Sequence, residues 1–319
     1  AEDGTRLACK LQYPDMASTV EADLRQLKLI FSIYRRYDAS IDTTNIHAEI
    51  SARLREELDY AREAAQMRLY ALMLEGEAGV HVPEPIDALT SKRLLTMTWL
   101  DGTPILDFIG DNPELRNTIA MNMFRAWYVP FYEYGVIHGD PHLGNYAVRP
   151  DQAINLLDFG CIRIFPPAFV EGVVDLYRAL QKEDFDATYA AYEKWGFVGL
   201  SKELVEVLNI WARFIYGPLL DDRVRSVADG VTAGEYGRKE AFRVHKALKE
   251  LGSVTVPQEF VFMDRAAIGL GGVFLHLRAE MNFFRLFNEQ IDGFSAATVA
   301  KRQAEVLSTA GLSPAESAA

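Results

Sequence analysis

The sequence of 319 residues is long enough for one large domain or two lobes, and its 49% hydrophobic and 24% charged residues are typical of a globular protein. Its formal net charge of −12 excludes a general attraction to nucleic acid or anionic lipid, so such a contact would need a local basic patch. The two cysteines, Cys9 and Cys161, form neither a disulfide framework nor a zinc pattern, which indicates a reducing cytosol. We interpret both as small buried hydrophobic residues.

The first third of the chain is predicted to combine short strands with long helices. Apolar residues recur at helical spacing in two segments, and Pro83 and Pro85 confine an extended segment to a sheet edge. In chain order we predict a strand at 6–12, a helix at 16–37, a helix at 46–74, an extended segment at 80–86 and a strand at 92–99. The turn-rich run at 100–104 marks a predicted boundary between a lobe of residues 1–99 and a lobe of residues 100–319.

The second lobe is predicted to be mainly helical. Asn112 and Pro113 form a suitable start for a helix that ends near Gly135, and short apolar runs at 146–148 and 154–157 predict a hairpin. Further helices are predicted at 167–182, 184–195, 201–217, 238–250, 257–290 and 296–308. The sequence thus predicts an α+β fold with a small mixed first lobe and a mainly helical second lobe.

The segment from His138 to Asn145, followed by Asp158-Phe159-Gly160, carries the strongest chemical signal. An Asp, an Asn five residues later and a second Asp before Phe-Gly suit phosphoryl transfer from a metal-nucleotide. Asp140 can orient or deprotonate an acceptor, while Asn145 and Asp158 can hold Mg²⁺ against the phosphates. A lone Asp in such a loop is usually a turn residue, but the spacing of the other groups favours the catalytic interpretation.

Three neighbours of Asp140 refine this interpretation. We expect His138 to bond to backbone near the second Asp motif, whereas His142 either faces the acceptor or packs. Gly139 stands where signalling protein kinases usually carry an arginine that pairs with a phosphate on the activation loop, so that switch has no partner here. No Ala-Pro-Glu follows Asp158, and a platform for a protein substrate is not supported. The glycines at 269, 271 and 272 lack the context of a phosphate loop and are expected to allow close helix packing.

Two charged positions in the first lobe leave alternatives open. Lys10 lies in the middle of a predicted strand. Its side chain either faces solvent or reaches the phosphates of a nucleotide, in which case a glutamate on a helix holds it in position. Asp59 and Glu63 lie one turn apart on the predicted helix, a repulsion that costs roughly 0.2–0.5 kcal/mol unless a cation such as Lys10 or a metal lies nearby. The alternative is a solvated face on which Arg55 pairs with Asp59.

Taken together, these residues resemble the UbiB family of atypical kinase-like proteins, which is associated with ubiquinone biosynthesis and related lipid homeostasis. The His-Gly-Asp block with its spaced Asn is shared with aminoglycoside and choline phosphotransferases, so it indicates only the superfamily. The Lys-x-Gln-Tyr-Pro strand and the Glu-Leu-Asp-Tyr segment are what select UbiB. The segments that carry the resemblance are 8–14, 57–64, 95–102, 138–145 and 157–160.

The resemblance implies a two-lobed protein-kinase-like fold with ATP and Mg²⁺ as cofactors, and slow ATP hydrolysis or phosphoryl transfer to an unknown small-molecule or lipid acceptor. It also implies a peripheral membrane contact for a protein we otherwise expect in the cytoplasm. The resemblance further implies that Lys10 forms an ion pair with Glu63 and that Asp140 is the catalytic-loop aspartate. It implies that Asn145 and Asp158 bind Mg²⁺. It also implies that Glu57 and Asp59 form an acidic pair near the nucleotide, and that Met97, Trp99 and Leu100 contact the adenine.

The sequence also departs from the family pattern. The family's Lys-x-Gly-Gln segment and Ala-rich nucleotide loop do not precede the strand of Lys10, so we expect either a longer natural protein or one without these elements. Thr98 stands where the family often has an acidic residue, and Gln66 where it often has Asn. Two rival functions follow: a small-molecule phosphotransferase of the aminoglycoside type, or a non-catalytic nucleotide-sensing scaffold.

Overall fold

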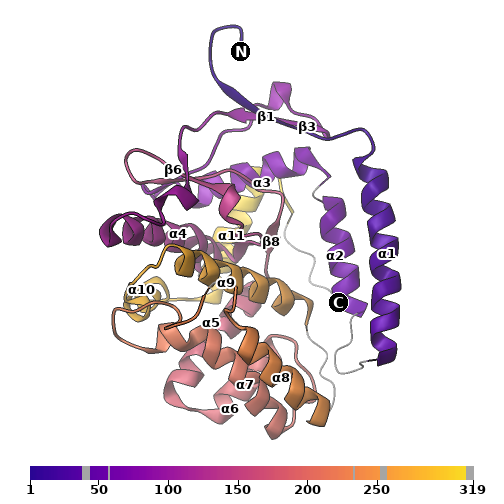
Figure 1. Cartoon of the computed structure of the whole chain (residues 1–319), viewed down its shortest axis with the longest axis vertical. Helices are drawn as coiled ribbons and strands as arrows, with labels where there is room; N and C mark the ends of the chain where they lie inside the picture. The colour runs from indigo at the N-terminus through magenta and orange to yellow at the C-terminus, as the bar shows by residue number, and fades with distance from the viewer. Residues whose placement is uncertain (38–43, 57, 233, 252–256, 314–319) are drawn as a thin grey trace.

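The chain folds into a small part with a two-stranded sheet and a larger helical part. The computed structural model describes residues 1–37, 44–56, 58–232, 234–251 and 257–313. Strand β1 (Leu7–Leu11) pairs antiparallel with β3 (Leu94–Thr98) at one end of the molecule, and the helices α5 to α9 lie toward the other end (Figure 1). The predicted α+β fold is confirmed, and so are the strand and the helix that open the chain, since α1 spans Met16–Tyr37.

The predicted helix over 46–74 is wrong as a single element. It forms two helices, α2 (Thr44–Glu56) and α3 (Tyr60–Met73), because Asp59 has an extended backbone and its carboxylate accepts hydrogen bonds from the first N–H groups of α3. The amide of Gln12 donates to the Leu58 carbonyl at 2.6 Å, which ties the break to the end of β1. These contacts favour the break over a continuous helix.

The helix predicted from Asn112 is confirmed as α4 (Pro113–Tyr134). The Asn112 side chain accepts from the Leu115 N–H at 2.9 Å, and Gly135 ends the helix with a φ of 66°, which glycine adopts without strain. The predicted hairpin is confirmed as β6 (Tyr146–Val148) and β7 (Ile154–Leu156). The structure adds β4 (Thr103–Pro104) beside β6, and a further antiparallel pair of β5 (Val136–His138) with β8 (Ile162–Ile164).

Strand pairing crosses the predicted lobe boundary. Strand β2 (Val80–His81) pairs in parallel with β7, so that Val80 lies opposite Ile154. Backbone hydrogen bonds therefore join the region before residue 99 to the hairpin after it. The boundary at residues 99 and 100 stays a prediction.

Most of the helices predicted after residue 165 are confirmed. They are α5 (Pro167–Lys182), α6 (Phe185–Lys194), α7 (Lys202–Tyr216), α8 (Arg238–Leu251) and α11 (Ala296–Ala310). The predicted helix at 257–290 is instead α9 (Gln258–His276) followed by α10 (Phe283–Gln290). Between them Arg278 has a φ of 49°, and Asn282 caps α10 by accepting from the Arg285 N–H at 3.0 Å.

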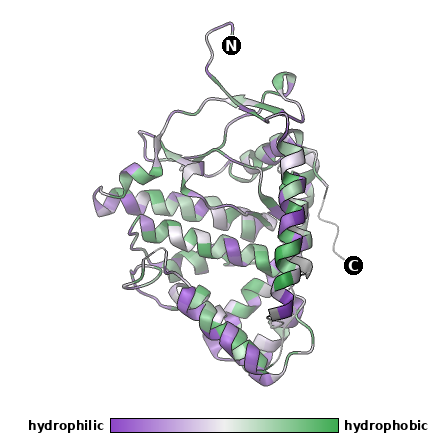
Figure 2. Ribbon diagram, turned by 45° about the vertical axis from the view of Figure 1, so that its right-hand side comes forward, coloured by the Kyte–Doolittle hydropathy of each residue, from purple (hydrophilic) through white to green (hydrophobic). Residues whose placement is uncertain are grey.

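A single hydrophobic core runs from α3 through α4 to the C-terminal helices. Most helices carry apolar and polar residues along their length, as expected where one face packs inward (Figure 2). The glycine expectation holds at two positions, because a side chain at Gly269 would collide with Pro141 and one at Gly271 with Tyr236. Cys161 is buried as predicted, but Cys9 is exposed, since it lies on the outer face of a two-stranded sheet.

Across the described ranges, every helix is too short or too polar to cross a membrane.

Candidate active site

Three charged side chains from distant parts of the sequence meet between β1 and the end of β7. The Lys10 Nζ atom lies 2.9 and 3.0 Å from the two carboxylate oxygens of Glu63, and 3.0 Å from Oδ2 of Asp158. Lys10 is positioned by β1, Glu63 by the first turn of α3, and Asp158 by the segment that leaves β7. The ion pair of Lys10 with Glu63 that the resemblance implied is therefore present, and the solvent-facing alternative for Lys10 is excluded.

Burial and charge compete at these three groups. Burial lowers the pKa of Lys10, but the charges of Glu63 and Asp158 outweigh this and hold the pKa well above its usual value. Burial raises the pKa of Glu63, whose side chain is 3% exposed, and the lysine only partly opposes that rise. Burial would also raise the pKa of Asp158, but Lys10 and the Gly160 N–H lower it overall. Lys10 and Asp158 are therefore charged at neutral pH.

His138 joins the two motifs of the site, as predicted. Its Nδ1 atom accepts from the Asp140 N–H at 3.2 Å, so Nε2 carries the proton and donates to the Asp158 carbonyl at 2.7 Å. Burial lowers the pKa of His138 and keeps the ring neutral. Tyr70 and Trp127 pack against the ring. His138 is thus a structural link between the loop of Asp140 and the segment of Asp158.

Close packing explains why residue 139 is a glycine, which the sequence alone did not show. Its N–H donates to the Cys161 carbonyl at 2.6 Å. A Cβ atom at this position would lie 2.7 Å from the Cys161 Sγ atom and 3.1 Å from that carbonyl oxygen. An arginine therefore does not fit here without displacing the segment after Asp158.

The predicted catalytic Asp140 contacts a residue that the sequence did not single out. Arg265 of α9 donates to the Asp140 Oδ1 atom at 3.2 Å, and both side chains remain partly exposed. Arg265 lies in a helix without a motif, so no sequence signal marks it. His142 is exposed and its Nδ1 atom accepts from the Gly144 N–H at 3.1 Å, which shows a turn contact and leaves its catalytic role a prediction.

The donors of Asn145 and Asp158 suit Mg²⁺. The Asn145 carbonyl accepts from the Leu157 N–H at 3.0 Å, which holds Asn145 beside the residue that precedes Asp158. The Asn145 amide nitrogen donates to the Asp140 carbonyl, so its side-chain oxygen is left available. Mg²⁺ is usually held by one or two protein oxygens together with substrate phosphates. The described residues contain no cluster of three acidic, histidine or cysteine ligands.

The remaining predicted binding residues are only partly brought to this site. Glu57 lies outside the described residues. Asp59 caps α3, and the alternative partner Arg55 pairs instead with Glu21. Met97 belongs to β3, and its side chain is buried in the core. Trp99 is half-exposed and donates to Asp101 at 2.8 Å, and Leu100 follows it at the connection between the two parts. Their adenine contacts stay predictions.

Comparisons with known proteins identify the family of this chain. The family described as ABC1 atypical kinase-like domain matches residues 1–192. The mitochondrial atypical kinase COQ8B of Danio rerio is 27% identical over 182 residues, which cover 57% of this chain and 29% of that protein. The mitochondrial atypical kinase COQ8 of Saccharomyces cerevisiae is 26% identical over 168 residues, with 52% and 34% covered. The chain thus spans about a third of the length of these relatives.

Two further similarities extend this picture. The chloroplastic protein ACTIVITY OF BC1 COMPLEX KINASE 3 of Arabidopsis thaliana is 25% identical over 213 residues, covering 64% of this chain and 29% of that protein. A solved structure of a Mycobacterium tuberculosis protein in complex with erythromycin superposes with a TM-score of 0.64 at 22% identity, covering 91% of this chain and 72% of that one, and it shows the same fold. The names of the relatives place them in mitochondria and chloroplasts, and the expected cytoplasmic location stays a prediction. Because the family match covers residues 1–192 of 319, the chain belongs to the ABC1 atypical kinase-like family, to which the UbiB proteins belong.

Proposed function

We propose that this chain binds ATP with Mg²⁺ at the site of Lys10, Glu63 and Asp158, and that it hydrolyses the nucleotide or transfers its terminal phosphoryl group. The observation that carries the proposal is the position of Lys10, whose ammonium group lies 2.9 Å from Glu63 and 3.0 Å from Asp158. In kinases a strand lysine held by a helical glutamate contacts the phosphates, and the Asp before Phe-Gly holds the metal. The geometry supports the same roles for Lys10, Glu63 and Asp158.

The residues would divide the work as follows. Lys10, oriented by Glu63, would bind the phosphates, and Asn145 and Asp158 would hold Mg²⁺, which supplies charge neutralisation at the phosphates when bound. Asp140 would accept a proton from, or orient, the attacking hydroxyl or water. Its contact with Arg265 keeps the carboxylate in place while leaving it partly exposed to an acceptor.

For the acceptor, we propose a small molecule or lipid of isoprenoid-quinone metabolism, with a peripheral membrane contact. The support is the family, whose relatives include the COQ8 proteins, together with the resemblance to ubiquinone-associated kinases. A protein substrate is disfavoured because no Ala-Pro-Glu follows Asp158 to form a platform for one. An assay that separates free phosphate from phosphorylated products distinguishes transfer to water from transfer to an acceptor.

We expect slow, Mg²⁺-dependent turnover of γ-labelled ATP by the purified chain. Free phosphate and organic phosphate products would be separated in parallel reactions that contain buffer, an amino-alcohol mixture or detergent-dispersed polyprenols. Free phosphate indicates an ATPase, a labelled polyprenol indicates a lipid kinase, and a labelled amino-alcohol favours the aminoglycoside-type rival. Binding of ATP without any turnover favours the scaffold. Turnover that persists in a chelator would contradict the proposal.

A further inference from the structure

A cavity of about 400 Å³ lies between helices of the helical part of the chain, and none of the three charged groups of the active site lines it. It is lined mainly by residues of α4, α7, α8 and α9. Protein interiors are close-packed and contain few voids larger than a water molecule, whereas sites for small molecules measure roughly 300–1,000 Å³. The size of this cavity therefore matches a ligand site better than a packing defect.

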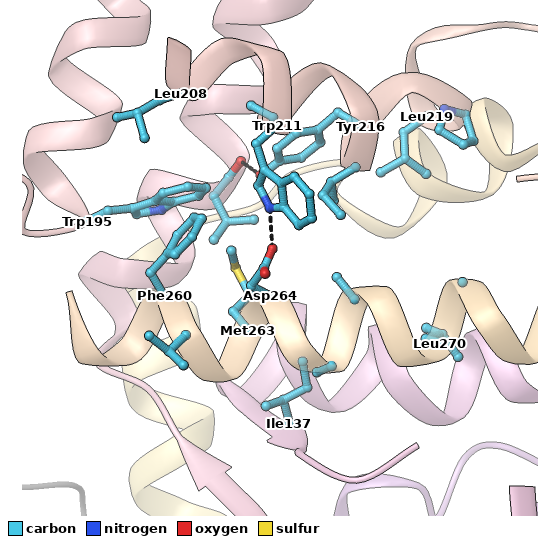
Figure 3. Close-up of a pocket in the computed structure, with 18 of the residues that line it drawn as sticks. Ile137, Trp195, Leu208, Trp211, Tyr216, Leu219, Phe260, Met263, Asp264 and Leu270 are labelled. Carbon is cyan, nitrogen blue, oxygen red and sulfur yellow. Dashed lines mark hydrogen bonds between the residues drawn. The ribbon is translucent and has the colours of Figure 1, made fainter. Parts of the chain in front are cut away.

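The walls of the cavity are apolar and largely aromatic. Figure 3 shows side chains from α7 and α9 that face each other across the space. They are Leu208, Trp211 and Tyr216 from α7 and Phe260 and Leu270 from α9, and Trp195, which follows α6, also lines the space. Neither lysine nor arginine is among the described residues that line it. Such walls favour an uncharged apolar body and disfavour an anionic group.

Two ionisable groups other than tyrosine hydroxyls stand in this apolar lining: Asp264 is the one carboxylate among the described lining residues, and His245 of α8 is the one imidazole. Asp264 projects from α9 toward the indole of Trp211, whose N–H donates to Oδ1 (Figure 3). Trp211 is the only hydrogen-bond partner that the described residues give this carboxylate. Burial raises the pKa of Asp264 to about 6, against the effect of the Trp211 hydrogen bond. A buried carboxylate without a cationic partner is costly, and its second oxygen is available to an incoming donor.

We propose that the cavity binds an uncharged, largely aromatic or aliphatic small molecule that carries one hydrogen-bond donor, an N–H or O–H group, which donates to Asp264. The apolar body fills the space between α7 and α9, and the donor end meets the carboxylate beside Trp211. This site is separate from the nucleotide site, and ligand binding requires no ATP.

The probe that tests this is N-phenyl-1-naphthylamine, which is uncharged, fluoresces in apolar surroundings and carries a single N–H. Its analogue 1-phenylnaphthalene lacks the donor and serves as a competitor. We expect saturable, one-to-one binding of the amine to the whole chain, with a preference over the hydrocarbon of roughly tenfold from the hydrogen bond to a charged group. Absence of saturable binding would overturn the proposal.

The variant Asp264→Leu and its matched control Asp186→Leu test the hydrogen bond between the probe and the carboxylate. Asp264→Leu removes the acceptor and is expected to bring the preference for the amine close to onefold, with the hydrocarbon bound at least as tightly. Asp186→Leu makes the same change at an exposed position of α6 outside the cavity lining and is expected to keep the preference. A preference that survives Asp264→Leu unchanged would refute the role of the carboxylate.

Ala212→Phe adds bulk from α7 to the space that Ala212 lines and is expected to weaken both probes at least tenfold. Far-UV circular dichroism and thermal unfolding would be recorded for each variant. If Ala212→Phe does not fold, the ratio measured for Asp264→Leu against Asp186→Leu still decides the proposal. Unchanged binding of both probes to a folded Ala212→Phe protein would place them elsewhere and contradict the site.

Discussion

Replacement of Lys10 by methionine is expected to lower the free energy of unfolding by about 2–3 kcal/mol. The side chain of Glu63 is 3% exposed and accepts both hydrogen bonds from Lys10, so the substitution leaves a buried carboxylate facing Asp158 without its cation. Loss of one partner of a buried pair costs roughly 3–5 kcal/mol, and the value is reduced here because Lys10 itself is 37% exposed. Urea unfolding of the wild type and of Lys10→Met would measure the difference.

The pH dependence of that loss identifies its cause. Burial raises the pKa of Glu63 above its usual 4.5, and removal of Lys10 raises it further. For an acid whose folded pKa is raised, the cost is complete above the folded pKa, shrinks as the pH falls toward 4.5, and disappears below it, where the carboxyl is protonated in both states. The deficit of Lys10→Met should therefore shrink between neutral pH and pH 4.5.

The matched double variant Lys10→Met/Glu63→Leu removes the buried charge together with its partner. It is expected to regain most of the stability but no nucleotide turnover, because the group that contacts the phosphates is still missing. A double variant as unstable as Lys10→Met would show that the loss comes from packing and not from the uncompensated charge.

Replacement of Asp140 by asparagine is expected to lower nucleotide turnover by roughly 10²–10⁴-fold, while ATP affinity changes little. The reason is that Asp140 lies on the loop before the hairpin, where its carboxylate contacts Arg265, whereas Lys10 is held by Glu63 and Asp158. Single-turnover rates and binding titrations would separate the two quantities.

Arg265→Gln provides a control for the surroundings of Asp140. Arg265 donates to the Asp140 carboxylate at 3.2 Å, so its loss is expected to slow turnover less than tenfold by releasing the carboxylate without removing it. Turnover in Asp140→Asn within twofold of the wild type would be incompatible with the assigned role of this residue.

The sequence predicted the parts of the fold that depend on local patterns. Asn112 with Pro113, and Gly135, mark the ends of α4 because caps act within one turn. The meeting of Lys10, Glu63 and Asp158 was implied by resemblance, since a kinase-like topology brings these three segments together. His138 was expected at the second Asp motif and bonds there.

Features that depend on packing between distant segments were not predicted. Asp59 fits a helical pattern, and the break beside it depends on the hydrogen bond from Gln12 to Leu58 across the structure. Cys9 is exposed on a strand that, among the described strands, pairs with β3 alone, and periodicity does not reveal such an edge. Helix α9 packs against both the loop of Asp140 and α7. This packing brings Arg265 to Asp140 and forms the cavity beside Asp264, and no motif in the sequence predicts it.

The central claim is that Asp158 holds Mg²⁺ for a nucleotide beside Lys10, and calorimetric titration with ATP tests it most directly. ATP would be titrated into the wild type and into Asp158→Asn, once in the presence of Mg²⁺ and once in the presence of a chelator. Asp186→Asn, which removes a charge at an exposed position of α6, would be measured in the same way as a control. We expect the wild type and Asp186→Asn to bind ATP on the order of 10–100-fold more tightly with Mg²⁺, and Asp158→Asn to lose that dependence. Equal Mg²⁺-dependent affinity in Asp158→Asn and the wild type would contradict the assignment.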